Sequence, residues 1–138
     1  MTVMKMQKLV YYSQAWHLAR TDEPLFGEPI EAWVNGPVVR ELYDQHRGQY
    51  SLSSWPTGDD EALTPAQRRL IDEILSTYGA HSATWLSELT HREEPWRRAR
   101  HGVPDNARSS ALIDPDDMRQ YYRAEEAKGF GPHAVAAA

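Results

Sequence analysis

Apolar side chains recur every three or four positions along several stretches of the chain, which is the spacing of helices that bury one face. The first stretch, Lys5–Ala19, has the widest apolar face, so we expect it to form the central helix. Further amphipathic stretches each follow a residue that can cap a helix N-terminus: Thr64, Ser82 and Asp114. Pro95 interrupts the pattern that follows Ser82, so a separate short helix is predicted for residues 96–100.

A strand-like alternation of apolar and polar side chains occupies Ile30–Val34. Gly36 and Pro37 interrupt this alternation, and we expect Pro37 to lie in the first turn of a helix that continues through Tyr43. A second short strand is expected at Ala111–Ile113, and the two strands are expected to pair as one small antiparallel ribbon. The predicted fold is therefore mainly α, with about five or six helices packed around the central helix.

The length of 138 residues is typical of one compact domain. We expect this domain to span residues 1–128, and we expect the small residues of 129–138 to form a flexible tail. The segment Arg47–Glu61 is rich in Gly, Ser, Pro and acidic side chains, which is typical of a long loop. Trp55 lies within this loop, where it either covers an edge of the core or serves as an exposed interface anchor.

Composition narrows the possible functions. The chain has no cysteine, which excludes disulfides and thiolate chemistry. No apolar run is long enough for a signal peptide or a membrane span, so we expect a cytoplasmic protein with no membrane partner. The net charge of −5 disfavours binding to nucleic acid through its phosphates. The chain has 5 Trp and 7 Tyr, residues that suit cores and protein interfaces equally well.

The residues that could carry chemistry do not form a complete site. No pair of histidines has the i, i+4 spacing of a zinc helix. Glu88 and His91 form one half of the motif used in di-iron bundles, without a second half elsewhere in the sequence. The sequence contains no nucleophile elbow and no nucleotide-binding loop. We therefore expect no catalytic residue, metal or cofactor, and we expect His91 to hydrogen-bond the backbone at a helix end.

One basic cluster stands out, formed by Arg92, Arg97, Arg98 and Arg100. Two interpretations are open: a solvated helix face that carries salt bridges, or a docking surface for a protein, since arginine is favoured at interfaces. A nucleic-acid patch is less well supported, because the cluster contains Glu93–Glu94 and lacks the context of a recognition helix.

The most distinctive residues lie in Lys5–Ala19, Glu28–Tyr43 and Tyr78–Arg100. The most specific pieces are Gln7-Lys8-Leu9 with Tyr11-Tyr12, Ala32-Trp33 with Gly36-Pro37-Val38, and Thr90-His91 with Pro95-Trp96. In order and spacing, these stretches resemble the Panacea domain family, also described as SocA-like antitoxins or phage-associated GepA-like proteins. The resemblance implies a mainly helical antitoxin of a toxin–antitoxin pair. Members of this family neutralise unrelated toxins by direct binding, and some are linked to delivery of the toxin to an energy-dependent protease. The resemblance implies no catalytic or metal-binding residue in this chain.

The signature residues of this resemblance have a mainly structural interpretation. We expect the following residues to fix the fold: Trp16, Trp33, Gly36, Pro37, Thr90, His91, Pro95 and Trp96. We expect contacts with a partner from exposed residues outside these motifs: Tyr50, Trp55, Arg97 and Arg98. Family members usually have another helix ahead of the first stretch, so we expect either a naturally shortened chain or a start upstream of Met1.

The sequence thus favours an antitoxin that binds a protein toxin encoded next to it. Two alternatives remain open at this stage. One is a metal-dependent hydrolase with a metal at His91 and Glu88, and the other is a DNA-binding regulator of its own operon that acts through Arg92–Arg100.

Overall fold

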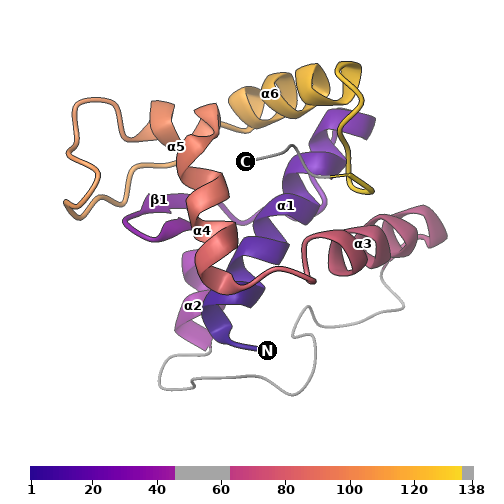
Figure 1. The fold of residues 1–138 in the computed structure, drawn as a ribbon, viewed down its shortest axis with the longest axis horizontal. Coiled ribbons are helices and arrows are strands. Elements are labelled where there is room, and N and C mark those ends of the chain that lie inside the picture. Colours follow the sequence, from indigo (N-terminus) through magenta and orange to yellow (C-terminus); the bar gives the residue numbers. More distant parts are fainter. Residues whose placement is uncertain (46–62, 135–138) are drawn as a thin grey trace.

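The computed structural model describes residues 1–45 and 63–134, and it is mainly helical. In chain order the elements are α1 (Val3–Thr21), β1 (Glu31–Trp33), β2 (Gly36–Val38), α2 (Arg40–Gln45), α3 (Pro65–Thr77), α4 (Ala83–Arg92), α5 (Glu94–Ala99) and α6 (Pro115–Ala127). Figure 1 shows the helices arranged around α1, with the β1–β2 hairpin beside α4. The predicted mainly α fold with a small two-stranded antiparallel sheet is confirmed.

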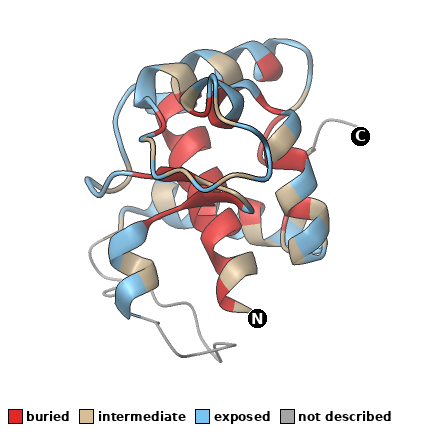
Figure 2. Ribbon diagram, turned by 90° about the vertical axis from the view of Figure 1, so that its left-hand side faces the viewer, coloured by how far each residue is buried: buried red, intermediate tan, exposed pale blue. Residues whose placement is uncertain are grey.

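Helix α1 is the centre of the molecule, as its wide apolar face predicts. Every residue from Met6 to Ala19 is buried, and α3, α4, α6 and β2 all pack against it. Figure 2 shows α1 as the largest continuous buried element. Because α1 is covered on all sides, its polar residues are buried as well, among them Gln7, Lys8 and Gln14. Those polar side chains therefore need partners inside the protein.

The helix boundaries follow the capping residues that the sequence predicts. Thr64 and Gln67 form a capping box at the start of α3, with Thr64 Oγ1 accepting from the Gln67 N–H at 3.1 Å. Ser82 caps α4 through the Trp85 N–H, and Asp114 caps α6 through the Asp116 N–H. These short-range signals explain why the helices are the most predictable part of the fold.

The region after Ile30 differs from the prediction. Gly36 and Pro37 belong to strand β2, which pairs with β1 in the register Glu31–Val38, Ala32–Pro37 and Trp33–Gly36. The expectation that Pro37 begins a helix is therefore wrong, and α2 begins at Arg40 instead. The reason is a close reversal of the chain at residues 34–35, which returns β2 along β1 before the helix can start.

The predicted pairing of Ile30–Val34 with Ala111–Ile113 is present only as an isolated bridge. The Ala32 N–H donates to the Ala111 carbonyl at 2.8 Å, and the Ile113 N–H donates to the Ile30 carbonyl at 2.8 Å. Strand β1 thus has its principal partner, β2, on one edge and this short segment on the other.

A buried carboxylate links several helices in the core. Glu93 lies at the junction of α4 and α5, and its Oε1 accepts hydrogen bonds from Tyr12 at 2.6 Å and Tyr122 at 2.8 Å. Tyr11 and Tyr122 are in turn linked through their hydroxyls at 3.1 Å. Burial raises the pKa of Glu93 to about 7, although the two tyrosine hydrogen bonds act in the opposite direction. This cluster connects α1, α6 and the α4–α5 junction.

The segment expected as a C-terminal tail is partly structured. The Phe130 N–H donates to the Glu125 carbonyl, and Gly131 pairs with Ala134 through backbone hydrogen bonds in both directions. Gly131 and Pro132 are buried. Residues 135–138 lie outside the described part of the chain.

The raised pKa of Glu93 predicts a particular pH dependence of stability. Between about pH 4.5 and 7 the folded state holds a proton on Glu93 that the unfolded state releases, so this group stabilises the fold less as pH rises. Removing the group with Glu93→Gln should therefore lower the free energy of unfolding more at pH 5 than at pH 8. Urea unfolding of both proteins at the two pH values measures this difference.

Glu94→Gln is the matched control for this experiment, because Glu94 is exposed and only pairs with Arg98 at the surface. Its effect on the free energy of unfolding should change much less between pH 5 and pH 8. Equal changes for the two variants would contradict the role given to the buried carboxylate.

Candidate protein-binding site

Polar side chains of α1 hold the β1–β2 hairpin by its backbone. The Val39 N–H donates to Gln7 Oε1 at 2.9 Å, and Gln7 Nε2 donates to the Val39 carbonyl at 3.4 Å. Lys8 Nζ donates to the Pro37 carbonyl at 3.4 Å. Lys8 is only 1% exposed, and this burial lowers its pKa to about 7. The Gln-Lys pair thus replaces a neighbouring strand along β2.

Helices α4 and α5 hold the other end of the hairpin. The Ser87 hydroxyl donates to the Asn35 carbonyl at 2.6 Å, and the Trp96 indole N–H donates to the Trp33 carbonyl at 2.8 Å. The His91 ring is hydrogen-bonded to the backbone of Val34 and stacks on Trp96 at 4.1 Å. Burial lowers the pKa of His91. Val34 belongs to the hairpin turn, and the buried Nε2 of His91 has no hydrogen-bond partner among the described residues.

Gly36 is required by both its backbone and its surroundings. Its φ of +118° is a conformation that side chains with a Cβ rarely adopt. A Cβ added at this position would lie 2.5 Å from Lys8 Cε and 3.0 Å from Thr90 Oγ1. The signature glycine therefore permits the buried lysine and Thr90 to approach the hairpin.

Arg100 fixes the following loop beside β1. Its guanidinium donates to the carbonyls of Ala32 and Pro104, both at 2.9 Å, and also to that of Ala107. It also lies over the Trp96 ring, 4.9 Å from the ring centroid. Arg100 is 3% exposed, so it does not belong to the solvated basic face that was one interpretation of its cluster.

The outward face of the hairpin carries a group of aromatic and charged side chains. The rings of Trp33 and Tyr43 meet edge to face with centroids 5.0 Å apart, and the Arg40 guanidinium lies 5.4 Å from the Trp33 ring. Glu31 accepts two hydrogen bonds from Arg40, at 2.8 and 2.9 Å, and one from the Trp33 indole at 2.9 Å. The Arg40 hydrogen bonds lower the pKa of Glu31. These bonds orient Trp33 and Arg40.

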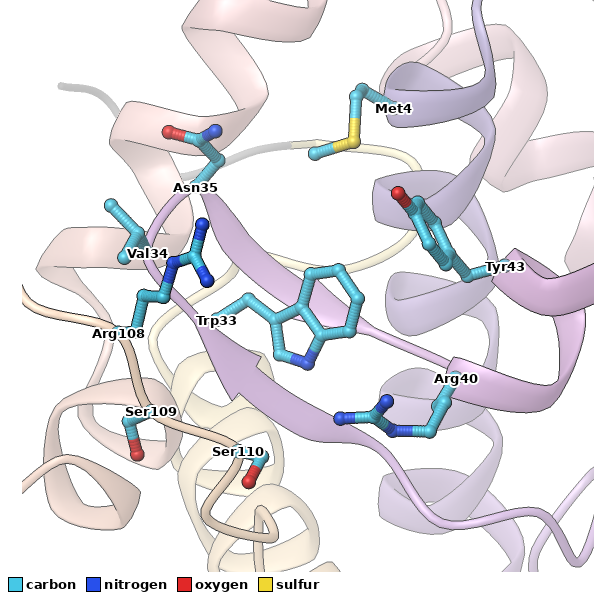
Figure 3. A pocket seen from close by; sticks show the side chains of 9 residues that line it. All are labelled: Met4, Trp33, Val34, Asn35, Arg40, Tyr43, Arg108, Ser109 and Ser110. Carbon is cyan, nitrogen blue, oxygen red and sulfur yellow. The ribbon is translucent and has the colours of Figure 1, made fainter. Parts of the chain in front are cut away.

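These side chains border a hollow of about 680 Å³, which we call the Trp33 hollow. Figure 3 shows its lining from the start of α1, the hairpin, α2 and the loop before residue 111. The lining residues are Met4, Trp33, Val34, Asn35, Arg40, Tyr43, Arg108, Ser109 and Ser110. Half-buried tryptophan and tyrosine beside arginine is the composition typical of the centre of a protein–protein interface.

The alternation along β1 explains why Trp33 faces outward. Ala32 is fully buried under the hairpin, and successive residues of a strand point to opposite faces. Trp33 therefore has two roles. Its carbonyl accepts a hydrogen bond from the Trp96 indole inside the fold, and its ring lines the hollow. The sequence predicts Trp33 only as a residue that fixes the fold, and it does not predict the outward ring or the neighbouring Arg40, Tyr43 and Arg108.

Of the four residues predicted to contact a partner, the structure describes two. Tyr50 and Trp55 lie outside the described residues. Arg97 and Arg98 are exposed on α5 and do not line the Trp33 hollow. Arg98 is paired with Glu94 at 2.9 Å and with Asp117 at 3.1 Å, as expected of a helix face with salt bridges.

Most of the residues expected to fix the fold meet around the hairpin. Gly36 contacts Thr90, Pro37 accepts from Lys8, and His91 stacks on Trp96. Pro95 is buried in the first turn of α5. Trp16 lies apart from this group: its indole N–H donates to the Tyr78 hydroxyl at 2.9 Å, and its ring packs edge to face on Tyr122.

The described residues contain neither a metal-binding cluster nor a membrane-spanning helix. In residues 1–45 and 63–134, no three or more His, Cys, Asp or Glu side chains are grouped so that they could hold a metal ion. Over the same residues, no helix combines the length and the apolar character needed to cross a membrane.

Comparison with known protein families gave one match. The family described as "Antitoxin SocA-like, Panacea domain" matches residues 6–97, which is more than half of the chain. The matched range includes most of α1, the whole hairpin, α2, α3 and α4. The comparisons with curated proteins and with solved structures gave no match.

The contacts of Gly36 predict a selective effect of adding one methyl group. Gly36→Ala should lower the free energy of unfolding by at least about 1 kcal/mol, because it combines an unfavourable φ with a clash against the buried lysine. Gly27→Ala is the control, since a Cβ at Gly27 would have nothing within 4 Å. Thermal and urea unfolding should leave Gly27→Ala within about 0.5 kcal/mol of the parent protein. Similar losses for both variants would show that the close approach at Gly36 is unimportant.

Proposed function

This chain belongs to the family of SocA-like antitoxins with a Panacea domain, and we propose that it neutralises a protein toxin by binding it directly. The observation that carries this proposal is the Trp33 hollow. Trp33 on the hairpin and Arg40 and Tyr43 on α2 lie inside the family match, and buried groups of three helices hold the hairpin in place. We propose that the toxin contacts Trp33, Tyr43 and Arg40 on this face.

The positions of the buried charged groups, Lys8 and Glu93, are consistent with binding without turnover. Lys8 and Glu93, whose pKa values are both strongly shifted, are buried and hydrogen-bonded within the fold. Neither lines the Trp33 hollow. These groups support the fold, and the hollow supports recognition, so we propose a stoichiometric antitoxin rather than an enzyme.

The charge of the chain favours one kind of toxin. The net charge of −5 would accelerate encounter with a basic protein, such as a toxin that acts on nucleic acid. We propose that this toxin is encoded beside the antitoxin gene and that the complex forms in the cytoplasm. Delivery of the bound toxin to an energy-dependent protease, which the resemblance implies for some relatives, would begin with this same complex.

The proposed DNA-binding role has less support. It requires a free basic surface at Arg92–Arg100, whereas Arg100 is buried and Arg98 is engaged by two carboxylates.

The direct test of the antitoxin proposal is co-expression of the chain with the product of each neighbouring gene. Growth rescue that follows the antitoxin-to-toxin ratio, with an equimolar complex in calorimetry, supports the proposal. Rescue at strongly substoichiometric antitoxin would contradict stoichiometric neutralisation and would indicate catalysis or delivery to a protease instead.

The proposed surface makes a prediction about single tryptophans. Trp33→Ala should weaken toxin binding by at least about tenfold, because central aromatic anchors typically contribute about 2 kcal/mol or more. Trp85→Ala is the matched control, since Trp85 is also half-buried but stacks on His81 outside the hollow. Calorimetric titration of the purified toxin should separate the two variants.

Tyr43→Ala provides a second test that spares the hydrogen bonds of Trp33. It should also weaken binding while leaving the circular dichroism spectrum unchanged. Equal binding of the parent protein, Trp33→Ala and Tyr43→Ala would place the toxin on another surface.

A further inference from the structure

The sheet of this protein has an open edge at Leu112. The hydrogen bonds of the bridge flank the facing pair Glu31 and Leu112: Ala32 N–H to Ala111 carbonyl, and Ile113 N–H to Ile30 carbonyl. In such a pair, the N–H and carbonyl of the facing residues point away from each other. Those of Leu112 therefore point away from β1. Within residues 1–45 and 63–134, neither group has a hydrogen-bond partner.

The side chain of Leu112 is also available. It is 60% exposed, which is unusual for a large apolar residue in this protein. Facing residues of antiparallel segments direct their side chains to the same side, so Leu112 lies on the outward side that Glu31 and Trp33 also occupy. The Leu112 edge is thus continuous with the face that carries the Trp33 hollow.

A second hollow adjoins Leu112, and we call it the Leu112 groove. It encloses about 760 Å³. Its apolar lining includes Leu18, Phe26 and Met118. Ser109 and Ser110 border the Trp33 hollow, whereas Leu112 and Ile113 border the groove. The segment 109–113 therefore runs between the two hollows.

The charge of the Leu112 groove is negative. Its charged lining residues are Asp22, Glu28, Asp114, Asp116 and Arg119. Arg119 binds Asp22 at 3.2 Å and Asp116 at 3.4 Å, and Arg123 also pairs with Asp22. Within the described residues, Glu28 and Asp114 have no such ion pair. The net negative charge of the groove lining favours a basic occupant.

We propose that an extended, basic segment of the toxin adds as a strand to the open edge at Leu112. The backbone of that segment pairs with the Leu112 N–H and carbonyl, as in other cases of strand addition. One of its apolar side chains enters the Leu112 groove, and a neighbouring Lys or Arg lies near Glu28. This inference rests on the proposed function, because the segment belongs to the toxin that the antitoxin neutralises.

The test compares two variants at one position against the purified toxin encoded beside the gene. Leu112→Ala removes the side chain and keeps the N–H, whereas Leu112→Pro removes both. The Leu112 N–H has no partner within the described residues, so the proline should leave the bridge to β1 intact. We expect Leu112→Pro to bind the toxin about fivefold more weakly than Leu112→Ala, the effect of one lost hydrogen bond. Glu28→Gln should also weaken toxin binding, and this loss of affinity should be larger at low ionic strength than at high ionic strength.

A second measurement does not depend on how the proline variant folds. In the unaltered protein, the amide hydrogen of Leu112 should exchange more slowly when the toxin is bound than when it is absent, as followed by NMR. Strand addition is wrong, while the antitoxin function stands, if the unaltered protein binds the toxin and two further results are found. These are equal toxin affinities of Leu112→Pro and Leu112→Ala, and an exchange rate of the Leu112 amide that is the same with and without toxin. If the unaltered protein does not bind the toxin at all, the proposed function itself fails. Slowed exchange in concentrated protein without toxin would assign the edge to a second copy of the chain and overturn the proposal.

Discussion

The β1–β2 hairpin depends on side chains that reach its backbone from three helices. Each strand has only three residues, and an isolated hairpin of this size is at best marginally stable in water. Gln7, Lys8, Trp96 and Arg100 supply donors to its carbonyls, and each of these side chains is buried. The outward face, with Trp33 and the Leu112 edge, has its geometry because the inward face is fixed in this way.

This arrangement separates support from recognition. The groups that are costly to bury, above all Lys8 and Glu93, are hydrogen-bonded to the hairpin or to tyrosines in the core. Buried polar groups favour the one packing in which they are all satisfied, so α1 fits the hairpin in one register. A rigid support of this kind allows the outward side chains to vary without loss of the fold.

The sequence predicts the helices well because their signals are local. Thr64, Ser82 and Asp114 satisfy backbone groups of their own helices, and the apolar spacing marks the buried faces. It predicts the hairpin poorly because Gly36-Pro37 resembles a helix start, and only the distant Lys8 and Thr90 explain the glycine. The buried state of Arg100 is likewise set by carbonyls of the hairpin and of its own loop. Trp33 was recognised as a key residue, but its outward ring follows from the pairing of β1 and β2, which no short-range pattern shows.

The central claim is that helices α1, α4 and α5 hold the hairpin so that its outward face can bind a toxin. A crystal structure of the chain in complex with the toxin encoded beside it tests this claim most directly. The account predicts that Trp33, Tyr43 and Arg40 are buried near the centre of the interface, with the hydrogen bonds from Gln7, Lys8 and Trp96 to the hairpin unchanged. An interface confined to α3 or to the exposed face of α5, with the Trp33 hollow open to solvent, would contradict it.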